Sequence, residues 1–150
     1  MTTEVFNVTG IAYYPKVFES NRDMHEGFYG ERDGAYTIDV ELDKENLDIV
    51  SKSGSRVEPR ITDEGLQIKF KRKHKHMIAA LGGAPKVVDH EDKPWDESKF
   101  IGNGSKVEVW FEVYDTKMGK GTRLLGVRVL DLVEYVSDND GEEPKAKLPF

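Results

Sequence analysis

The sequence predicts an all-β domain of five strands, and two kinds of pattern support this. Residues 35–42, 66–71 and 106–114 each alternate between apolar and polar side chains, which is the period of a half-buried strand. Residues 5–12 and 124–135 are rich in β-branched and aromatic residues, which favour extended backbone. In the last of these segments, Gly126 predicts a bend or a bulge.

One short helix is expected at residues 43–52. Asp43 is placed to act as its N-cap, and Asn46 takes the position at which a capping box would carry Glu or Gln. Gly54 follows and predicts the end of the helix. The helix therefore lies between the strand at residues 35–42 and the next strand.

The remaining segments predict connections. Residues 115–122 carry two glycines, which favours a hairpin loop between the last two strands. Residues 77–99 have no clear period and contain further Gly and Pro residues, so we expect an excursion with one helical turn near residues 77–81. Residues 137–150 lack any periodic pattern and predict a disordered tail.

Five strands, one short helix and long connections are typical of the OB-fold, a five-stranded Greek-key barrel. A β-sandwich is the main structural alternative. We assign residues 1–136 to the barrel domain and residues 137–150 to the tail. A chain of 150 residues is long enough for one such hydrophobic core.

Composition restricts the class of protein. The chain has no cysteine, which excludes disulfides and thiolate metal sites. No run of about 18 apolar residues is present, and the first residues have no features of a signal peptide. We therefore expect a cytoplasmic protein.

Charge is segregated along the chain, although its formal net value is −6. Residues 51–85 hold eight basic and three acidic residues, a net of +5. Residues 131–150 hold six acidic residues and two lysines, a net of −4. A basic middle and an acidic end favour a site for a polyanion and a tail that competes for it.

The strongest local feature is a run of five cations that begins on a predicted strand. It consists of Lys69, Lys71, Arg72, Lys73 and Lys75. Closely spaced cations favour phosphate groups as their counter-charge. The alternative is a solvated edge strand that its lysines protect from pairing.

Aromatic residues on outward positions are the second feature. Proteins that bind single strands stack bases on exposed rings within a cationic groove. We expect Trp110 and Tyr114 to share an outward face with Lys106, and Trp95 to contribute from a loop. Tyr13 and Tyr14 are adjacent, so at least one points away from the core. The rim near the last hairpin is expected to carry Lys106, Lys117, Lys120 and Arg123. Some of these rings could instead cover the open end of the barrel.

The chain ends in an acidic segment followed by Leu148, Pro149 and Phe150. The acidic residues are Asp138, Asp140, Glu142 and Glu143. A terminal ring can enter an apolar pocket while the α-carboxylate meets a cation. This pattern favours a peptide that binds a protein partner over a plain solubilising tail.

Several of these segments resemble the single-stranded DNA-binding proteins of tailed bacteriophages. The similar stretches are residues 36–47, 68–73, 93–95, 100–107 and 125–135. The resemblance implies an OB-fold that coats single-stranded DNA during phage replication, recombination and repair, in the host cell cytoplasm. It also implies an acidic tail that binds replication proteins such as a polymerase or helicase. Lys145 and Lys147 make the tail of this chain less acidic than the family pattern.

We therefore predict a single-stranded DNA-binding protein without catalysis, cofactor or metal, with a homodimer left open. Two alternatives stay open. One is a non-catalytic protein-interaction module whose cationic strand binds an acidic partner. The other is a metal-dependent nuclease that uses His74, His76 and Asp89, although the surrounding lysines disfavour a cation there.

Overall fold

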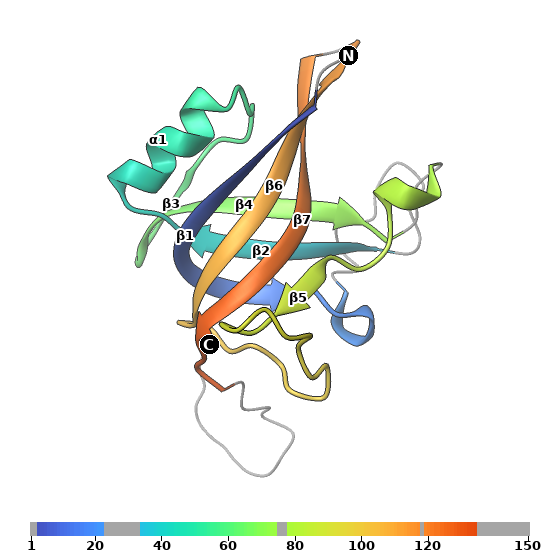
Figure 1. The fold of residues 1–150 in the computed structure, drawn as a ribbon. Coiled ribbons are helices and arrows are strands. Elements are labelled where there is room, and N and C mark those ends of the chain that lie inside the picture. Colours follow the sequence, from blue (N-terminus) through green and yellow to red (C-terminus); the bar gives the residue numbers. More distant parts are fainter. Residues whose placement is uncertain (1–2, 23–33, 75–77, 118, 135–150) are drawn as a thin grey trace.

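The computed structural model describes residues 3–22, 34–74, 78–117 and 119–134 (Figure 1). The strands are β1 (Thr3–Lys16), β2 (Ala35–Glu41), β3 (Arg60–Thr62), β4 (Gly65–Lys73), β5 (Lys86–Val88), β6 (Lys106–Thr116) and β7 (Gly119–Asp131). The one α-helix among these residues is α1 (Lys44–Lys52), and two 3₁₀ turns are η1 (Glu19–Asn21) and η3 (Ala79–Leu81).

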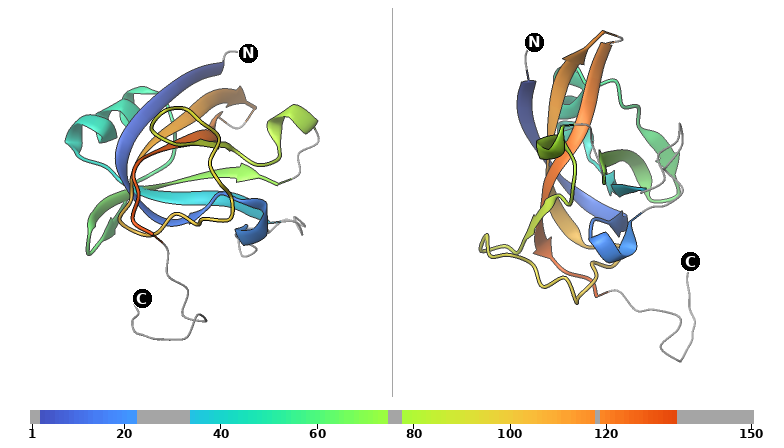
Figure 2. Two further views of the ribbon diagram at one scale, coloured as in Figure 1. Left: turned by 60° about the horizontal axis from the view of Figure 1, so that its bottom comes forward. Right: turned by 90° about the vertical axis from the view of Figure 1, so that its right-hand side faces the viewer.

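The strands form one sheet in the order β3-β4-β2-β1-β6-β7-β5. The sheet curls into a barrel, because β4 comes back against β7 without pairing with it (Figures 1 and 2). The barrel strands β1, β2, β4, β6 and β7 take the OB-fold order, so the predicted all-β OB-fold is confirmed. The described part of the chain has seven strands rather than five, because β3 and β5 have only three residues each and are too short to show a period.

Aromatic rings and branched aliphatic side chains fill the barrel. Phe70 on β4 meets Phe111 on β6 with ring centroids 5.0 Å apart, and Phe6 on β1 stacks on the same ring at 5.7 Å. The inward residues of β6 that were predicted from alternation are buried; they are Val107, Val109, Phe111 and Val113. The core therefore ties β4, on one side of the barrel, to β6 on the other.

β1 is longer than the segment predicted at residues 5–12. Its first part pairs with β6 and its last part with β2, and its register with β2 shifts between Tyr13 and Lys16. Tyr14 has a φ of 50° at this point, a left-handed conformation that is uncommon outside glycine. The irregularity brings Lys16 back into pairing, opposite Thr37 on β2.

α1 begins as predicted. The Asp43 carboxylate accepts a hydrogen bond of 2.9 Å from the backbone N–H of Asn46. The Asn46 side chain accepts one of 2.9 Å from the backbone N–H of Thr9 on β1. Asn46 thus fastens the helix to the barrel, a contact that a Glu or Gln in a capping box would not make.

β2 is not the half-buried strand that its alternation predicts. Thr37 is 3% exposed and Asp39 6% exposed, although both lie on the outward side. β2 is a central strand, and its outward neighbours on β1 and β4 include lysines and a tyrosine. Long amphipathic side chains on the neighbouring strands cover the short polar side chains of β2. The alternation within a single strand cannot predict this covering.

The β6–β7 hairpin was predicted with too long a loop. Residues 115–116 and 119–122 belong to the strands, and Thr116 pairs with Gly119. The bulge predicted at Gly126 is confirmed: Gly126 pairs with Trp110 while Leu124 pairs with Phe111, which leaves Leu125 as the extra residue. Gly126 also pairs with Lys86 on the parallel strand β5, which the sequence did not predict.

Candidate nucleic-acid interface

The basic run lies on β4, where alternation sends its members to opposite sides of the barrel wall. Lys69, Lys71 and Lys73 point outward, with Lys71 and Lys73 exposed. They face Asp39, Thr37 and Ala35 across the pairing with β2. Three lysines at alternate positions of one strand rise from a single face; the alternation of residues 66–71 predicted this orientation for Lys69 and Lys71.

β1 adds two residues to this face. Lys16 pairs with Thr37, and Tyr13 pairs with Asp39, so both point to the same side as the lysines of β4. We call this surface the lysine face and define it by Tyr13, Lys16, Lys69, Lys71 and Lys73. Lys16 is not among the site residues predicted from the sequence, because the predicted first strand ends at residue 12.

Acidic side chains near the end of β2 limit how far the positively charged surface of the lysine face extends. Asp39 lies 3.5 Å from the Arg60 guanidinium, and the Tyr13 hydroxyl donates a 3.5 Å hydrogen bond to Glu41. Burial, followed by the charges of Glu41 and Glu64, raises the pKa of Tyr13. Its ring therefore stays neutral at physiological pH and offers a face on which a base can stack.

Arg72 is placed differently from its neighbours, because its position in the alternation is inward. Its guanidinium donates to the backbone carbonyls of Ala80, Gly82, Gly83 and Leu124, over 2.8–3.2 Å. Burial is the main cause that lowers the pKa of Arg72, and the nearby charge of Arg123 adds to it. Arg72 joins β4, the segment before β5 and β7 at the closure of the barrel, so its donors are already used for structure.

Trp110 lies on the outer side of β6, between Asn7 on β1 and Gly126 on β7. The Arg128 guanidinium lies over its ring, 4.8 Å from the centroid. β1 and β2 separate β6 from β4 in the sheet, and both figures show β6 and β4 on opposite sides of the barrel (Figures 1 and 2). The structure therefore does not bring Trp110 together with the lysine face.

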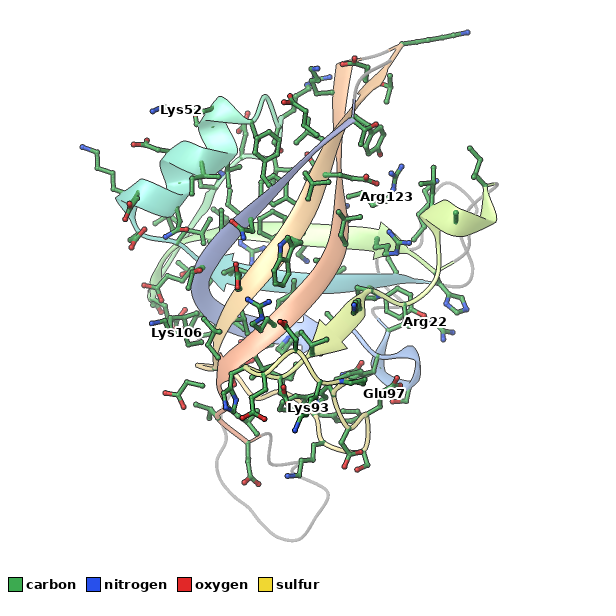
Figure 3. All side chains as sticks on the ribbon, in the orientation of Figure 1. Arg22, Lys52, Lys93, Glu97, Lys106 and Arg123 are labelled. Atoms are coloured by element: carbon green, nitrogen blue, oxygen red, sulfur yellow. The ribbon has the colours of Figure 1, made fainter. Side chains whose placement is uncertain are left out.

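The other predicted residues of β6 and β7 lie on the Trp110 side as well. Arg123 is 8% exposed, forms an ion pair with Glu112, and lies 4.1 Å from the centroid of the Tyr114 ring. Figure 3 shows Lys106 and Arg123 far apart along the hairpin. Lys106 is exposed, and its backbone lies opposite Asp131 in the β6–β7 ladder. Nearer the hairpin turn, Lys120 forms an ion pair with Asp115. Lys120 and Arg123 are thus engaged with local acids or rings, whereas Lys117 is exposed.

Trp95 has a structural place. Its indole N–H donates a 2.8 Å hydrogen bond to the carbonyl of Lys99, and its ring packs partly against the core. Its backbone N–H also donates to Val87, which continues the edge at β5. These contacts hold the loop in place and give the Trp95 ring a structural role.

Of the residues proposed for a nuclease, the structure describes His74 and Asp89, and each of them makes local hydrogen bonds. The ring Nδ1 of His74 lies 2.9 Å from the Tyr36 hydroxyl. The Asp89 carboxylate accepts from the backbone N–H groups of Glu91 and Lys93, bonds that lower its pKa. Among the residues that the structure describes, no three His, Asp or Glu side chains are grouped closely enough to hold a metal ion.

Some predicted site residues lie outside the described residues. They are Lys75, His76 and the tail residues Asp138, Asp140, Glu142, Glu143, Leu148, Pro149 and Phe150. The same holds for the boundary between the predicted domains 1–136 and 137–150. In the part that is described, no helix is both long and apolar enough to cross a membrane.

No protein-family model and no curated protein sequence matches the chain. Solved structures do match. That of gp2.5, a single-stranded DNA-binding protein encoded by bacteriophage T7, aligns with a TM-score of 0.62 at 19% identity and covers 95% of this chain and 98% of that one. The single-stranded DNA-binding protein from bacteriophage Enc34 aligns with a TM-score of 0.53 at 15% identity, covering 91% and 88%.

The chain has the fold of the phage single-stranded DNA-binding proteins. The Enc34 protein in complex with single-stranded DNA also matches, with a TM-score of 0.51 at 15% identity, over 85% of this chain and 86% of that one. In the OB-fold, oligonucleotides bind on the face of the second and third barrel strands. In this chain those strands are β2 and β4; β4 carries three residues of the lysine face, and β2 lies between them and the two on β1.

Proposed function

We propose that this chain binds single-stranded DNA without sequence preference, on the lysine face. The observation that carries the proposal is the clustering of Lys16, Lys69, Lys71 and Lys73 on β1 and β4, on either side of the central strand β2. Four ammonium groups on one curved face suit a chain of phosphates, whereas base-specific reading would need more fixed hydrogen-bond donors and acceptors. The Tyr13 ring lies beside them and supplies a stacking surface.

The fold neighbours support the same proposal, since they are proteins that bind single-stranded DNA. We propose binding without catalysis, cofactor or metal, because no group on the lysine face is arranged to activate a nucleophile. The finer roles, in phage replication, recombination and repair, are proposals that rest on the resemblance. So are the host cytoplasm as location, a replication protein as partner of the tail, and homodimer formation.

The test is a salt series with fluorescently labelled oligo(dT) and with a duplex of equal length. Fluorescence anisotropy should show that the single strand binds more tightly and that the logarithm of affinity falls linearly with the logarithm of salt concentration. Replacing Lys16, Lys69, Lys71 and Lys73 by Ala should flatten this slope by about 0.7 for each lost phosphate contact. A variant with Lys52, Lys93, Lys99 and Lys106 replaced by Ala loses the same charge elsewhere.

Equal loss of binding in the two quadruple variants would mean that only net charge matters, and the lysine face would not be the interface. Cleavage of the oligonucleotide on addition of divalent metal would support the nuclease instead. Binding to an acidic peptide but not to single-stranded DNA would support the protein-interaction module.

A further inference from the structure

The outer side of β5, β6 and β7 contains an open pocket of about 480 Å³. We call it the Trp110 pocket and define it by Lys86, Asp92, Trp110, Leu125, Gly126 and Arg128, which line it. The volume falls within the range of roughly 300–1,000 Å³ that is usual for ligand pockets. β6 and β4 are on opposite sides of the barrel (Figures 1 and 2), so this pocket is not part of the lysine face.

The pocket exists because a glycine lies between two large side chains. Trp110, Gly126 and Lys86 are direct neighbours across β6, β7 and β5. Adjacent strands are about 4.8 Å apart, so the backbones of Trp110 and Lys86 are separated by roughly 10 Å with no side chain between them. Trp110 and Leu125 are half-buried, so part of their apolar surface stays accessible. The hollow therefore has apolar walls and room for one large apolar side chain.

Arg128 holds the Trp110 wall of the pocket in place. Its guanidinium lies over the Trp110 ring, 4.8 Å from the centroid. It donates to Asp92 at 2.5 and 2.9 Å and to Glu108 at 2.6 Å. A wall that is fixed before a ligand arrives lowers the entropy cost of binding. Trp and Arg are also the residue types that are enriched where protein interfaces bind most strongly.

The surroundings of the Trp110 pocket are acidic. The loop at residues 89–99 follows β5, and a bridge between Val88 and Pro94 holds it beside the pocket; Figure 3 shows Lys93 and Glu97 on this loop. Its net charge is −3, from the acids Asp89, Glu91, Asp92, Asp96 and Glu97 and the lysines Lys93 and Lys99. Counting Lys86, Arg128 and Glu108 as well leaves a net of −2. This charge repels a polyanion and attracts a cationic partner.

We propose that the Trp110 pocket docks a cationic segment of a partner protein. One large apolar side chain of the segment enters the hollow against Trp110 and Leu125, and its lysine or arginine side chains meet Glu91 and Asp92. An apolar surface with a charged rim is typical of protein interfaces. Because the pocket and the lysine face are on opposite sides, the partner and DNA can be bound at the same time. The proposal does not depend on the proposed function.

The test is an NMR titration of the full-length, isotope-labelled protein with three short peptides of equal length. Acetyl-Lys-Phe-Lys-Lys-amide carries both the apolar anchor and the charge. Acetyl-Glu-Phe-Glu-Glu-amide reverses the charge, and acetyl-Lys-Gly-Lys-Lys-amide lacks the anchor. The first peptide should shift the amide signals of residues 86–92, 108–112 and 124–128, and it should bind about fivefold more tightly than either of the others.

Variants separate the charge from the anchor. Glu91→Lys should weaken binding of the Lys-Phe peptide by about threefold. Glu58→Lys makes the same change of charge in the exposed segment before β3 and should leave the affinity unchanged. Lys86→Gln keeps the stem of the wall and removes a repelling charge, so it should tighten binding by about twofold. Trp110→Ala should abolish the shifts while the affinity for oligo(dT), which shows that the variant is folded, stays within about twofold.

Four results would overturn the proposal. Equal affinity of the lysine and glutamate peptides for the pocket would show that it does not select a cation. Equal affinity of the phenylalanine and glycine peptides would show that the hollow takes no anchor. Shifts confined to residues 13–16 and 67–73 would place the peptide on the lysine face. Shifts of the pocket residues on raising the protein concentration without peptide would show that a second copy occupies it.

The same titration keeps this inference separate from the proposed function. Saturating oligo(dT) should leave the affinity for the Lys-Phe peptide unchanged, and displacement of the peptide by oligo(dT) would show that the pocket binds DNA instead. A protein that binds oligo(dT) but none of the peptides contradicts only the docking of a partner. A protein that binds the Lys-Phe peptide but not oligo(dT) contradicts only the proposed function.

Discussion

Adjacent cations on β4 have different roles, and the difference follows from strand alternation. Lys71 points to solvent, whereas Arg72 points inward and donates to four carbonyl oxygens. Sequence analysis assigned both to phosphate binding because it treated the basic run as one unit. The period of two was already visible in residues 66–71, and extending it by one residue would have placed Arg72 with the core.

Replacing Arg72 by Met should therefore act on stability. We expect the free energy of unfolding to fall by about 2–3 kcal/mol, because partly buried carbonyls lose their donors. Lys71→Met, one position away, should change it by about 0.5 kcal/mol or less. Urea denaturation followed by circular dichroism measures both. A similar loss in the two variants would mean that the Arg72 hydrogen bonds add little.

For Lys16 we expect an effect on DNA binding and not on stability. Its position on β1 was not predicted from the sequence. Lys16→Ala should lower the slope of log affinity against log salt for oligo(dT) by about 0.7. The unfolding free energy should hardly change, because the side chain lies on the outer face. Lys99→Ala is the matched control for lost charge. If both variants give the same slope as the unchanged protein, Lys16 does not contact a phosphate.

At the scale of elements, α1 was predicted with its boundaries nearly correct because its signals are local. Asp43 caps the helix through the Asn46 N–H, and this bond is the main cause that lowers the pKa of Asp43. β3 and β5 could not be predicted, since three-residue strands depend on their neighbours for pairing. The length of β1 was underestimated because Tyr14 and Pro15 interrupt its regular pattern at the shift in register.

The Asp43 cap predicts a dependence of stability on pH. A carboxylate whose pKa is lowered in the folded state contributes stability above the pKa of the unfolded chain, about 3.9, and loses it as pH falls through the folded value. The difference in unfolding free energy between the unchanged protein and Asp43→Ala should therefore be present at pH 7 and shrink below about pH 4. Asp43→Asn keeps a capping oxygen, so its advantage over Asp43→Ala should not vary with pH.

At the scale of the whole molecule, Trp110 and the lysines of β4 lie on two separate surfaces of the barrel, although the sequence predicted one. Trp110 and the lysines of β4 were expected in one groove, because each lies on the outward side of its own strand. Outward means a different direction on each strand of a closed barrel. Pairing register and strand order decide which outward residues meet, and neither can be obtained from the alternation of a single strand.

The separation of Trp110 from the lysine face predicts that Trp110 adds little to the affinity for single-stranded DNA. Trp110→Ala should leave the affinity for oligo(dT) within about twofold, well below the 1–3 kcal/mol cost of losing a stacked base. Tyr13→Ala should weaken binding by an amount within that range, with little change in the salt slope. Fluorescence anisotropy with labelled oligo(dT) measures both variants. A large loss for Trp110→Ala in a correctly folded protein would place DNA on the Trp110 side.

The closure of the barrel at Arg72 has a consequence for motion. β4 and β7 lie against each other without a ladder of backbone hydrogen bonds. The Arg72 guanidinium joins the two strands there, whereas backbone hydrogen bonds join the other neighbouring barrel strands. Opening this seam would break the hydrogen bond from Arg72 to the Leu124 carbonyl and the packing between the two strands, but no ladder of backbone hydrogen bonds. β4 and β7 should then part more readily than β1 and β6, and their seam-facing amides should exchange hydrogen with solvent first. Three residues of the lysine face lie on β4, so under the proposed function a movement of β4 would adjust this face to a bound single strand.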